Sequence, residues 1–236
     1  MKKRIFTLAF VLASCVNMMA QNSVEDEISE WKDRSLAGFY VGYVAGLGMP
    51  DAMSNNIGKS MEIGFELPIW DPTLSDKLKF HLNLGFNWKN YRMTKDDRAF
   101  IKDYSTGHVV IGQPKYLNSE LGKGCVDYSR MKIFSITLPL LLEYQFSEPW
   151  FVAFGPVVNF NLHGSIYTKF SNDRGERVTT SSNGLRQSVV TADLKLLFGH
   201  EDIALYGKWS PCRQLREKYA PGLDFTGISF GVQAVF

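Results

Sequence analysis

The amino-acid sequence predicts an all-β fold, an eight-stranded antiparallel up-and-down transmembrane β-barrel. Three observations predict it. Polar and apolar residues alternate in eight segments, the connections between these segments are alternately short and long, and large apolar side chains gather on one face of each segment. The composition is compatible, since 236 residues with 45% apolar and 21% charged content can form one sizeable domain or two small ones. A disordered chain and a disulfide-dense scaffold are excluded, because the charge content is ordinary and the chain has only 3 cysteines.

Residues 1–20 have the features of a signal peptide. Met1-Lys2-Lys3-Arg4 is basic, residues 5–16 are apolar and uncharged, and Met19-Ala20 precedes a polar, charged stretch. In an alternative interpretation, Leu12-Ala13-Ser14-Cys15 is a lipobox and Cys15 is lipidated. We expect residues 21–35 to form a periplasmic lead-in segment and residues 36–236 to form the barrel. Without residues 1–20 the chain has 23 basic and 24 acidic residues, and this balance predicts no nucleic-acid partner.

The strands are predicted in chain order from their alternation. The first strand alternates weakly, the second has apolar residues at odd positions, and the third has apolar or aromatic residues at every even position. The fourth alternates except at Leu141, the fifth to seventh alternate weakly, and the eighth ends on Phe236. A helix would mix the two sets of residues on every face, whereas a strand separates them. The eight predicted strands are 39–47, 61–69, 80–88, 134–144, 152–162, 190–198, 203–209 and 228–236.

Two uncharged runs are long enough to suggest transmembrane helices. Residues 149–168 contain no charge over twenty positions, the length of a membrane-spanning helix. This run includes Pro149, Gly155 and Pro156, however, and it is too polar for lipid insertion as a helix. Residues 35–50 contain four glycines, so this run is also unsuitable as a membrane-spanning helix. Both runs are therefore assigned to strands.

Short and long connections alternate without exception along the predicted barrel. The short ones are 71–77, 147–149 and 199–202, and the long ones are 50–58, 94–126, 164–187 and 210–224. Transmembrane barrels have this asymmetry, with tight turns at the periplasmic rim and long loops outside. An even number of strands places both ends of the barrel domain on the short-turn side.

The apolar faces are expected to point toward lipid. Aromatic residues near the strand ends are typical of interfacial girdles: Tyr43, Phe80, Trp88, Trp150, Phe160, Trp209 and Phe236. The charged residues of the opposite faces would then lie inside: Glu62, Glu66, Lys79, His81, Lys89, Glu143, Asp193, Lys195 and Lys208. Because side chains fill an eight-stranded barrel, we expect a charge-paired, plugged interior. A soluble barrel would instead line its interior with Phe80, Leu82 and Leu84.

One strand resembles a known family. The segment Ile136-Thr137-Leu138-Pro139-Leu140-Leu141-Leu142-Glu143-Tyr144-Gln145-Phe146 is similar to the IPLLLKYxF strand of the small outer-membrane β-barrel proteins that include PorT. Gly155-Pro156, the glycine-rich first strand and the closing strand agree, and the similarity covers about residues 36–236. The resemblance implies an eight-stranded, non-enzymatic outer-membrane barrel. PorT itself is associated with protein secretion, and a shared barrel pattern does not transfer that role.

No catalytic, cofactor-binding or metal site is predicted. His81, His108, His163 and His200 show no spacing typical of a catalytic triad or a metal site, although an active centre assembled from several loops is an alternative. Cys125 and Cys212 lie beside long loops in an oxidising compartment, so these two residues are the candidates for a disulfide. The loops, above all 94–126, are candidate surfaces for other envelope or surface proteins.

The sequence therefore predicts an integral protein of the outer membrane of a Gram-negative bacterium. It would act as a structural or binding module with long extracellular loops, with outer-membrane lipids as partners and without a cofactor. Two alternatives are an outer-membrane lipid or peptide hydrolase or acyltransferase, and a soluble lipocalin-like ligand-binding barrel.

Overall fold

The computed structural model describes residues 34–48, 57–93, 99–103, 106–112, 126, 128–171, 177–220, 223 and 225–236. The predicted signal peptide, 1–20, and almost all of the predicted lead-in segment, 21–35, lie outside the described residues, and both stay predictions. Within the described part of the chain, no helix is long and apolar enough to cross a membrane. The compact unit described below spans Ser35–Phe236.

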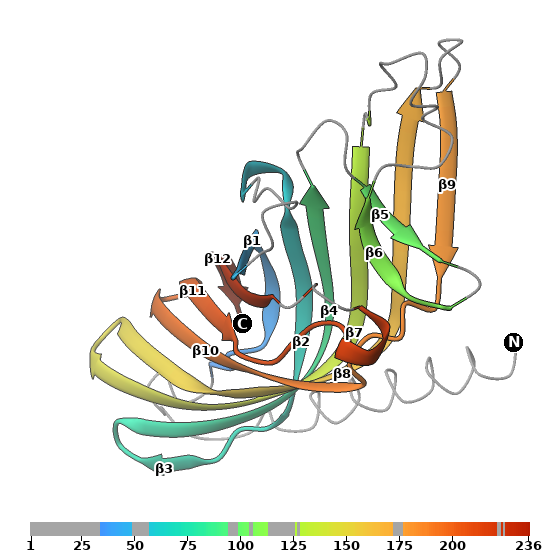
Figure 1. Cartoon of the computed structure of the whole chain (residues 1–236). Helices are drawn as coiled ribbons and strands as arrows, with labels where there is room; N and C mark the ends of the chain where they lie inside the picture. Colours follow the sequence, from blue (N-terminus) through green and yellow to red (C-terminus); the bar gives the residue numbers. More distant parts are fainter. Residues whose placement is uncertain are drawn as a thin grey trace, which may run out of the picture. The chain divides into compact units, whose positions relative to one another are not determined.

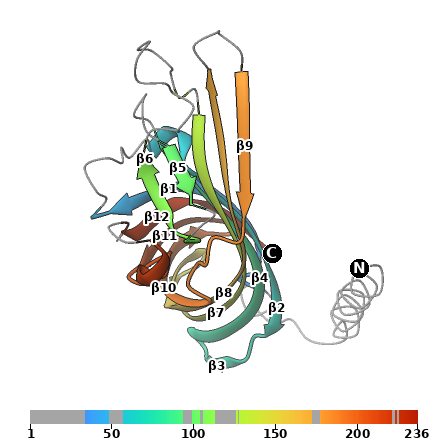
Figure 2. The same cartoon turned by 45° about the vertical axis from the view of Figure 1, so that its right-hand side comes forward.

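Over the residues that the structure describes, eight strands close into an antiparallel barrel (Figures 1 and 2). Each strand pairs with its neighbours in chain order. The pairings of β1 with β12 and of β8 with β10 complete the circle. The predicted fold class is thereby confirmed. The barrel strands are β1 (Gly38–Leu47), β2 (Met61–Trp70), β4 (Leu78–Met93), β7 (Tyr128–Ser147), β8 (Trp150–Ser171), β10 (Val190–His200), β11 (Ile203–Ser210) and β12 (Thr226–Val235).

The short and long connections lie at opposite ends of the barrel, because the strands alternate in direction. We call these the turn end and the loop end. At the turn end, β3 (Thr73–Ser75) pairs with β4 inside the first short connection. At the loop end lie the short helices η1 (Ile57–Lys59) and η2 (Glu217–Tyr219) and the hairpin β5 (Ala99–Lys102) with β6 (Val109–Gly112).

The structure extends three of the predicted strands at the loop end, and β4, the first of them, continues to Met93. β7 begins at Tyr128 and β8 continues to Ser171, well past the predicted ends. β9 (Arg177–Asn183) then returns along β8, so most of the predicted long connection 164–187 is a strand hairpin (Figure 1). A β-bulge explains why the alternation did not predict the continuation of β8. Opposite the β7 step from Phe134 to Ser135, β8 has an extra residue at Leu162, which shifts the alternation by one position.

The described part of the long connection 94–126 is also more structured than a solvated loop. Phe100 on β5 and Val109 on β6 are buried, and Ser129 of β7 accepts a hydrogen bond from the Phe100 backbone N–H. The hairpin is held against the inner face of the β7 and β8 extensions, because Thr168 of β8 also donates a hydrogen bond to the Phe100 carbonyl.

Inside the barrel, apolar side chains cluster near both ends. The turn-end cluster includes Leu141, Phe151 and Leu197, and the loop-end cluster includes Tyr91, Phe100 and Phe225. Along β7, the buried apolar residues Ile133 and Leu141 flank the buried polar residues Ser135 and Thr137. Leu141, which breaks the alternation of the predicted fourth strand, is thus an interior residue of the turn-end cluster.

Candidate functional site

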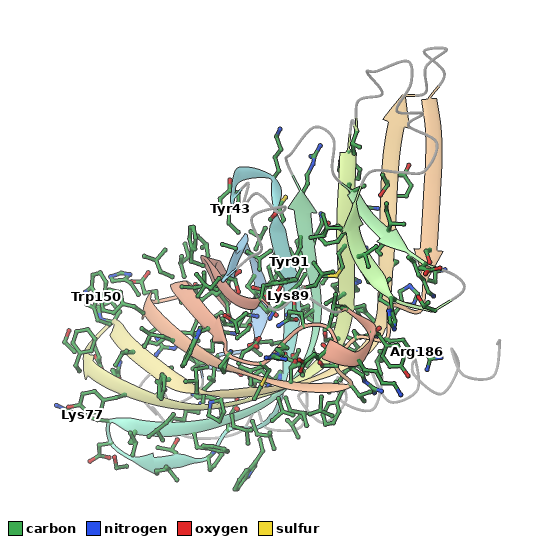
Figure 3. The ribbon with its side chains drawn as sticks, in the orientation of Figure 1. Tyr43, Lys77, Lys89, Tyr91, Trp150 and Arg186 are labelled. Atoms are coloured by element: carbon green, nitrogen blue, oxygen red, sulfur yellow. The ribbon has the colours of Figure 1, made fainter. Side chains whose placement is uncertain are left out.

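The nine charged residues assigned to the interior from the sequence all lie inside the barrel, and each residue is at most 5% exposed. They come from five strands, β2, β4, β7, β10 and β11, because each occupies an inward position of the alternation. Figure 3 shows Lys89 and Tyr91, which occupy consecutive inward positions of β4, within the barrel. Burial of nine charged side chains costs free energy unless each of them has a partner of opposite charge or a hydrogen-bond partner.

Glu62 and Lys208 form the first ion pair across the interior. The Lys208 Nζ lies 2.5 Å from the Glu62 Oε1, and the Asn87 amide donates to the same oxygen at 2.7 Å. Lys208 stands on β11 and Glu62 on β2, with β12 and β1 between them in the barrel wall. The pair therefore bridges strands that are not neighbours.

Lys195 and Glu66 form the second pair, with 2.6 Å between the Lys195 Nζ and the Glu66 Oε1. Tyr40 lies beside both ammonium groups, since the Nζ atoms of Lys195 and Lys208 are 4.9 Å and 4.5 Å from its ring centroid. Such cation–π contacts stabilise buried ammonium groups. Gly64 makes room for this ring, because a Cβ at Gly64 would lie 2.1 Å from the Tyr40 Cζ.

Lys89 and Asp193 form the third pair, which joins β4 to β10. The Lys89 Nζ is 2.8 Å from the Asp193 Oδ2 and donates to the Ser210 hydroxyl at 2.8 Å. The strands β7 and β8 separate β4 from β10 in the wall. Three ion pairs thus connect distant parts of the barrel wall through the interior.

A separate polar cluster lies at the turn end. The His81 ring contacts Glu143 through Nε2 at 2.8 Å and Asp71 through Nδ1 at 3.3 Å. Lys79 is buried on the same strand, two inward positions nearer to the turn than Asn83. The other histidines lie elsewhere. His108 packs on Tyr219, His163 is at the β8 bulge, and His200 packs on Trp150. In the described ranges, no group of three or more His, Cys, Asp and Glu side chains could hold a metal ion.

The loop end is covered by side chains from several connections. Phe225 packs edge-on against Tyr91, with 5.2 Å between the ring centroids, and Leu185, Leu215 and Leu223 complete the same buried cluster as Phe100. This cluster of side chains over the loop end was not predicted from the sequence. Its signals are two short apolar segments, 99–101 and 109–111, on either side of a turn that contains Gly107 at a positive φ of 71°.

The proposed disulfide cannot be placed, because Cys125 lies outside the described residues. Cys212 follows β11 and is half-buried, and the Ala192 backbone N–H lies 3.5 Å from its Sγ. The pairing of Cys125 with Cys212 therefore stays a prediction.

Comparison with known proteins gives only distant likenesses. No family model matches the chain, and no curated protein matches it. The crystal structure of Ail, the attachment invasion locus protein of Yersinia pestis, is 10% identical, with a TM-score of 0.39, over 85% of this chain and 97% of that one. Ail in complex with the heparin analogue sucrose octasulfate is 9% identical, with the same TM-score and coverage. A mutant porin of Rh. blastica is 7% identical, with a TM-score of 0.19, over 86% of this chain and 100% of that one.

These likenesses are too remote to assign a family or an activity. The architecture stands on the strand pairings described above, and the resemblance of residues 136–146 to the PorT-containing family stays a prediction.

Proposed function

We propose that the chain is an integral outer-membrane β-barrel protein with a closed interior, which acts as a structural or binding module through its loop end. The observation that carries this proposal is the inversion of the two strand faces. Large apolar residues are exposed around the barrel, including Phe154 at 53% and Leu205 at 61%, whereas the nine charged residues of the candidate site are buried inside. A soluble protein rarely exposes a continuous apolar surface of this kind, whereas a membrane barrel requires one.

The aromatic residues support two interfacial girdles. Phe80, Trp150 and Phe236 stand near the turn end, and Tyr43, Trp88, Phe160 and Trp209 stand toward the loop end. Figure 3 labels one residue of each group, Trp150 and Tyr43, in separate parts of the barrel. Trp and Tyr rings, which have a polar edge, favour the two membrane interfaces, and phenylalanines accompany them here. The apolar band between these girdles is the proposed membrane-spanning zone.

The closed interior supports a module rather than a pore. The three cross-barrel ion pairs occupy the lumen, and the loop-end cluster covers it. An eight-stranded barrel has no space for an aqueous channel beside such side chains. Beyond the barrel, β7, β8 and β9 rise as a sheet at the loop end (Figure 1), and envelope or surface proteins are the proposed partners there.

The orientation of β4 argues against the soluble alternative. A lipocalin-like barrel would place Phe80, Leu82 and Leu84 inside, but their neighbours His81 and Asn83 are the buried residues, each 0% exposed. For the hydrolase or acyltransferase alternative, no observation on the described part of the chain favours an active centre, because the four histidines lie at four separate places.

The test is fractionation of cells that express the full chain, followed by electrophoresis of cold and boiled samples of the solubilised outer membrane. We expect outer-membrane recovery, cleavage near Ala20 by mass spectrometry, and a mobility shift on boiling. Planar bilayers that contain the purified protein should show no stable conductance, with a porin as the positive control. Recovery in the soluble periplasm would refute the membrane assignment, and a steady ion current would refute the closed interior.

A further inference from the structure

A group of basic and aromatic side chains covers one part of the outer barrel surface at the loop end. We define the basic patch as Arg92 of β4, Tyr128, Arg130 and Lys132 of β7, and Tyr167 and Lys169 of β8. All six occupy outward positions, because their neighbours Tyr91, Ser129, Met131 and Thr168 point inward and are buried.

The strand register arranges the basic patch in rows. Trp88 pairs with Phe134 in the uppermost apolar row. The next row contains Asn90, Lys132 and Ser165, followed by a row of Arg92, Arg130 and Tyr167 and a row of Tyr128 and Lys169. Outward positions on a strand are about 6.6 Å apart. With a strand tilt of about 40°, Lys132 and Arg130 lie roughly 5 Å and 10 Å above the Phe134 row.

The two tyrosines position three of the four basic side chains. The Arg92 guanidinium is 4.2 Å from the Tyr128 ring centroid, and the Arg130 guanidinium is 5.2 Å from that of Tyr167. The Lys169 Nζ is 5.7 Å from the Tyr167 centroid, and the two tyrosine rings meet edge to face at 5.8 Å. Stacking of this kind limits side-chain motion, so the charges are partly preorganised for a ligand.

Within the described residues, the patch also lacks the counter-charge that an ordinary surface would supply. Arg92 and Arg130 are directly opposite each other across β4 and β7, an arrangement that is unfavourable for like charges. Among the ion pairs between described residues, none involves Arg92, Arg130, Lys132 or Lys169. The described outward positions of β1, β2, β10, β11 and β12 contain no Lys or Arg. The basic charge is therefore concentrated on about three of the eight barrel strands.

We propose that the basic patch binds the phosphate groups of a phosphorylated glycolipid in the outer leaflet of the membrane. The inference rests on the proposed function, because it needs the apolar band below the patch to face lipid. Trp88 and Phe134, whose ring centroids are 4.9 Å apart, lie directly below the first basic row. A lipid can therefore contact the aromatic pair with its acyl chains and the basic patch with its headgroup. The headgroup region is about 5–8 Å thick on each side of the hydrocarbon core, so Lys132 lies within its height and Arg130 lies just above it.

This continuity favours a lipid over a soluble polyanion. A soluble ligand would be recognised at the loop tips, whereas the patch begins at the edge of the apolar band and faces sideways from the barrel wall. Lys and Arg are suited to this position, because their apolar stems can lie against the band while their charges reach the phosphates.

The experiment measures binding of diphosphorylated and dephosphorylated lipid A to the purified, delipidated protein in uncharged detergent. The patch variant combines Arg92→Gln, Arg130→Gln, Lys132→Gln and Lys169→Gln. A control variant combines Lys59→Gln at the loop end with Lys77→Gln at the turn end, both of which are exposed. The single variants Arg130→Gln and Lys77→Gln form a pair with equal charge change. The heat-dependent mobility shift shows for each sample that the barrel is folded.

We expect the wild type and the control to bind the diphosphorylated lipid, with affinity reduced roughly fivefold by Arg130→Gln and at least about a hundredfold by the patch variant. Equal binding by a folded patch variant, or equal binding of the dephosphorylated lipid, would overturn the inference. Binding of a soluble sulfated polysaccharide in place of the lipid, dependent on the same four residues, would also overturn it. A wild-type chain that is soluble without detergent would instead refute the proposed function, and the inference with it.

Discussion

Replacement of Lys208 by methionine tests whether the cross-barrel ion pairs stabilise the fold. The Lys208 Nζ lies 2.5 Å from Glu62 and donates to the Tyr40 hydroxyl at 3.3 Å, and the side chain is 1% exposed. Methionine keeps most of the length of the side chain but leaves the Glu62 carboxylate, 0% exposed, without its ammonium partner. Loss of one partner of a buried pair costs about 3–5 kcal/mol. Because Asn87 still donates to the carboxylate at 2.7 Å, we expect the lower end, about 3 kcal/mol.

The assay is urea unfolding of the protein in phospholipid vesicles, followed by tryptophan fluorescence and linear extrapolation. A double-mutant cycle measures the coupling between the two residues. It consists of the wild type, Lys208→Met, Glu62→Gln and the variant that carries both substitutions. We expect the double variant to lose less stability than the two single variants together, by about 1–3 kcal/mol, because it leaves no charge unpaired at this site. Lys77→Met, an exposed turn residue, is the control and should change the free energy of unfolding by less than about 0.5 kcal/mol. A loss below about 1 kcal/mol for Lys208→Met, or strict additivity in the cycle, would refute the reasoning.

Three further outcomes are expected. Leu140 is the central residue of the seven apolar outward positions from Phe134 to Phe146. Leu140→Arg should therefore lower the free energy of unfolding by about 2–4 kcal/mol in the vesicle assay, and a negligible loss would contradict a lipid-facing surface. Gly64→Ala should cost about 1–3 kcal/mol because its Cβ would overlap the Tyr40 ring, whereas Gly207→Ala, where a Cβ meets nothing within 4 Å, should cost less in the same assay. If Cys125 and Cys212 are paired, thiol labelling of the mature protein should detect neither before reduction and both after it, and two reactive thiols before reduction would disprove the disulfide.

The strand pattern was accurate wherever the alternation is uninterrupted. The third predicted strand, 80–88, lies within β4 with the expected faces inward and outward. The prediction was wrong beyond residue 162, because one extra residue in β8 reverses the phase of the alternation and hides the continuation of the strand to Ser171. It was incomplete in 94–126, because β5 and β6 are four residues each and such short apolar segments carry no reliable period.

Where the alternation is uninterrupted, the sequence alone determined which side chains share a face. Successive residues of a strand point to opposite sides, so the parity of Glu62, Lys89 or Lys195 is a local property that needs no knowledge of the neighbouring strands. Only the tertiary structure decided which charges meet. Lys208 lies 146 residues from Glu62, and Lys195 lies 129 residues from Glu66. Their contact depends on the strand order, the register of every pair and the closure of β8 onto β10, and these are properties of the whole barrel, which no single segment contains.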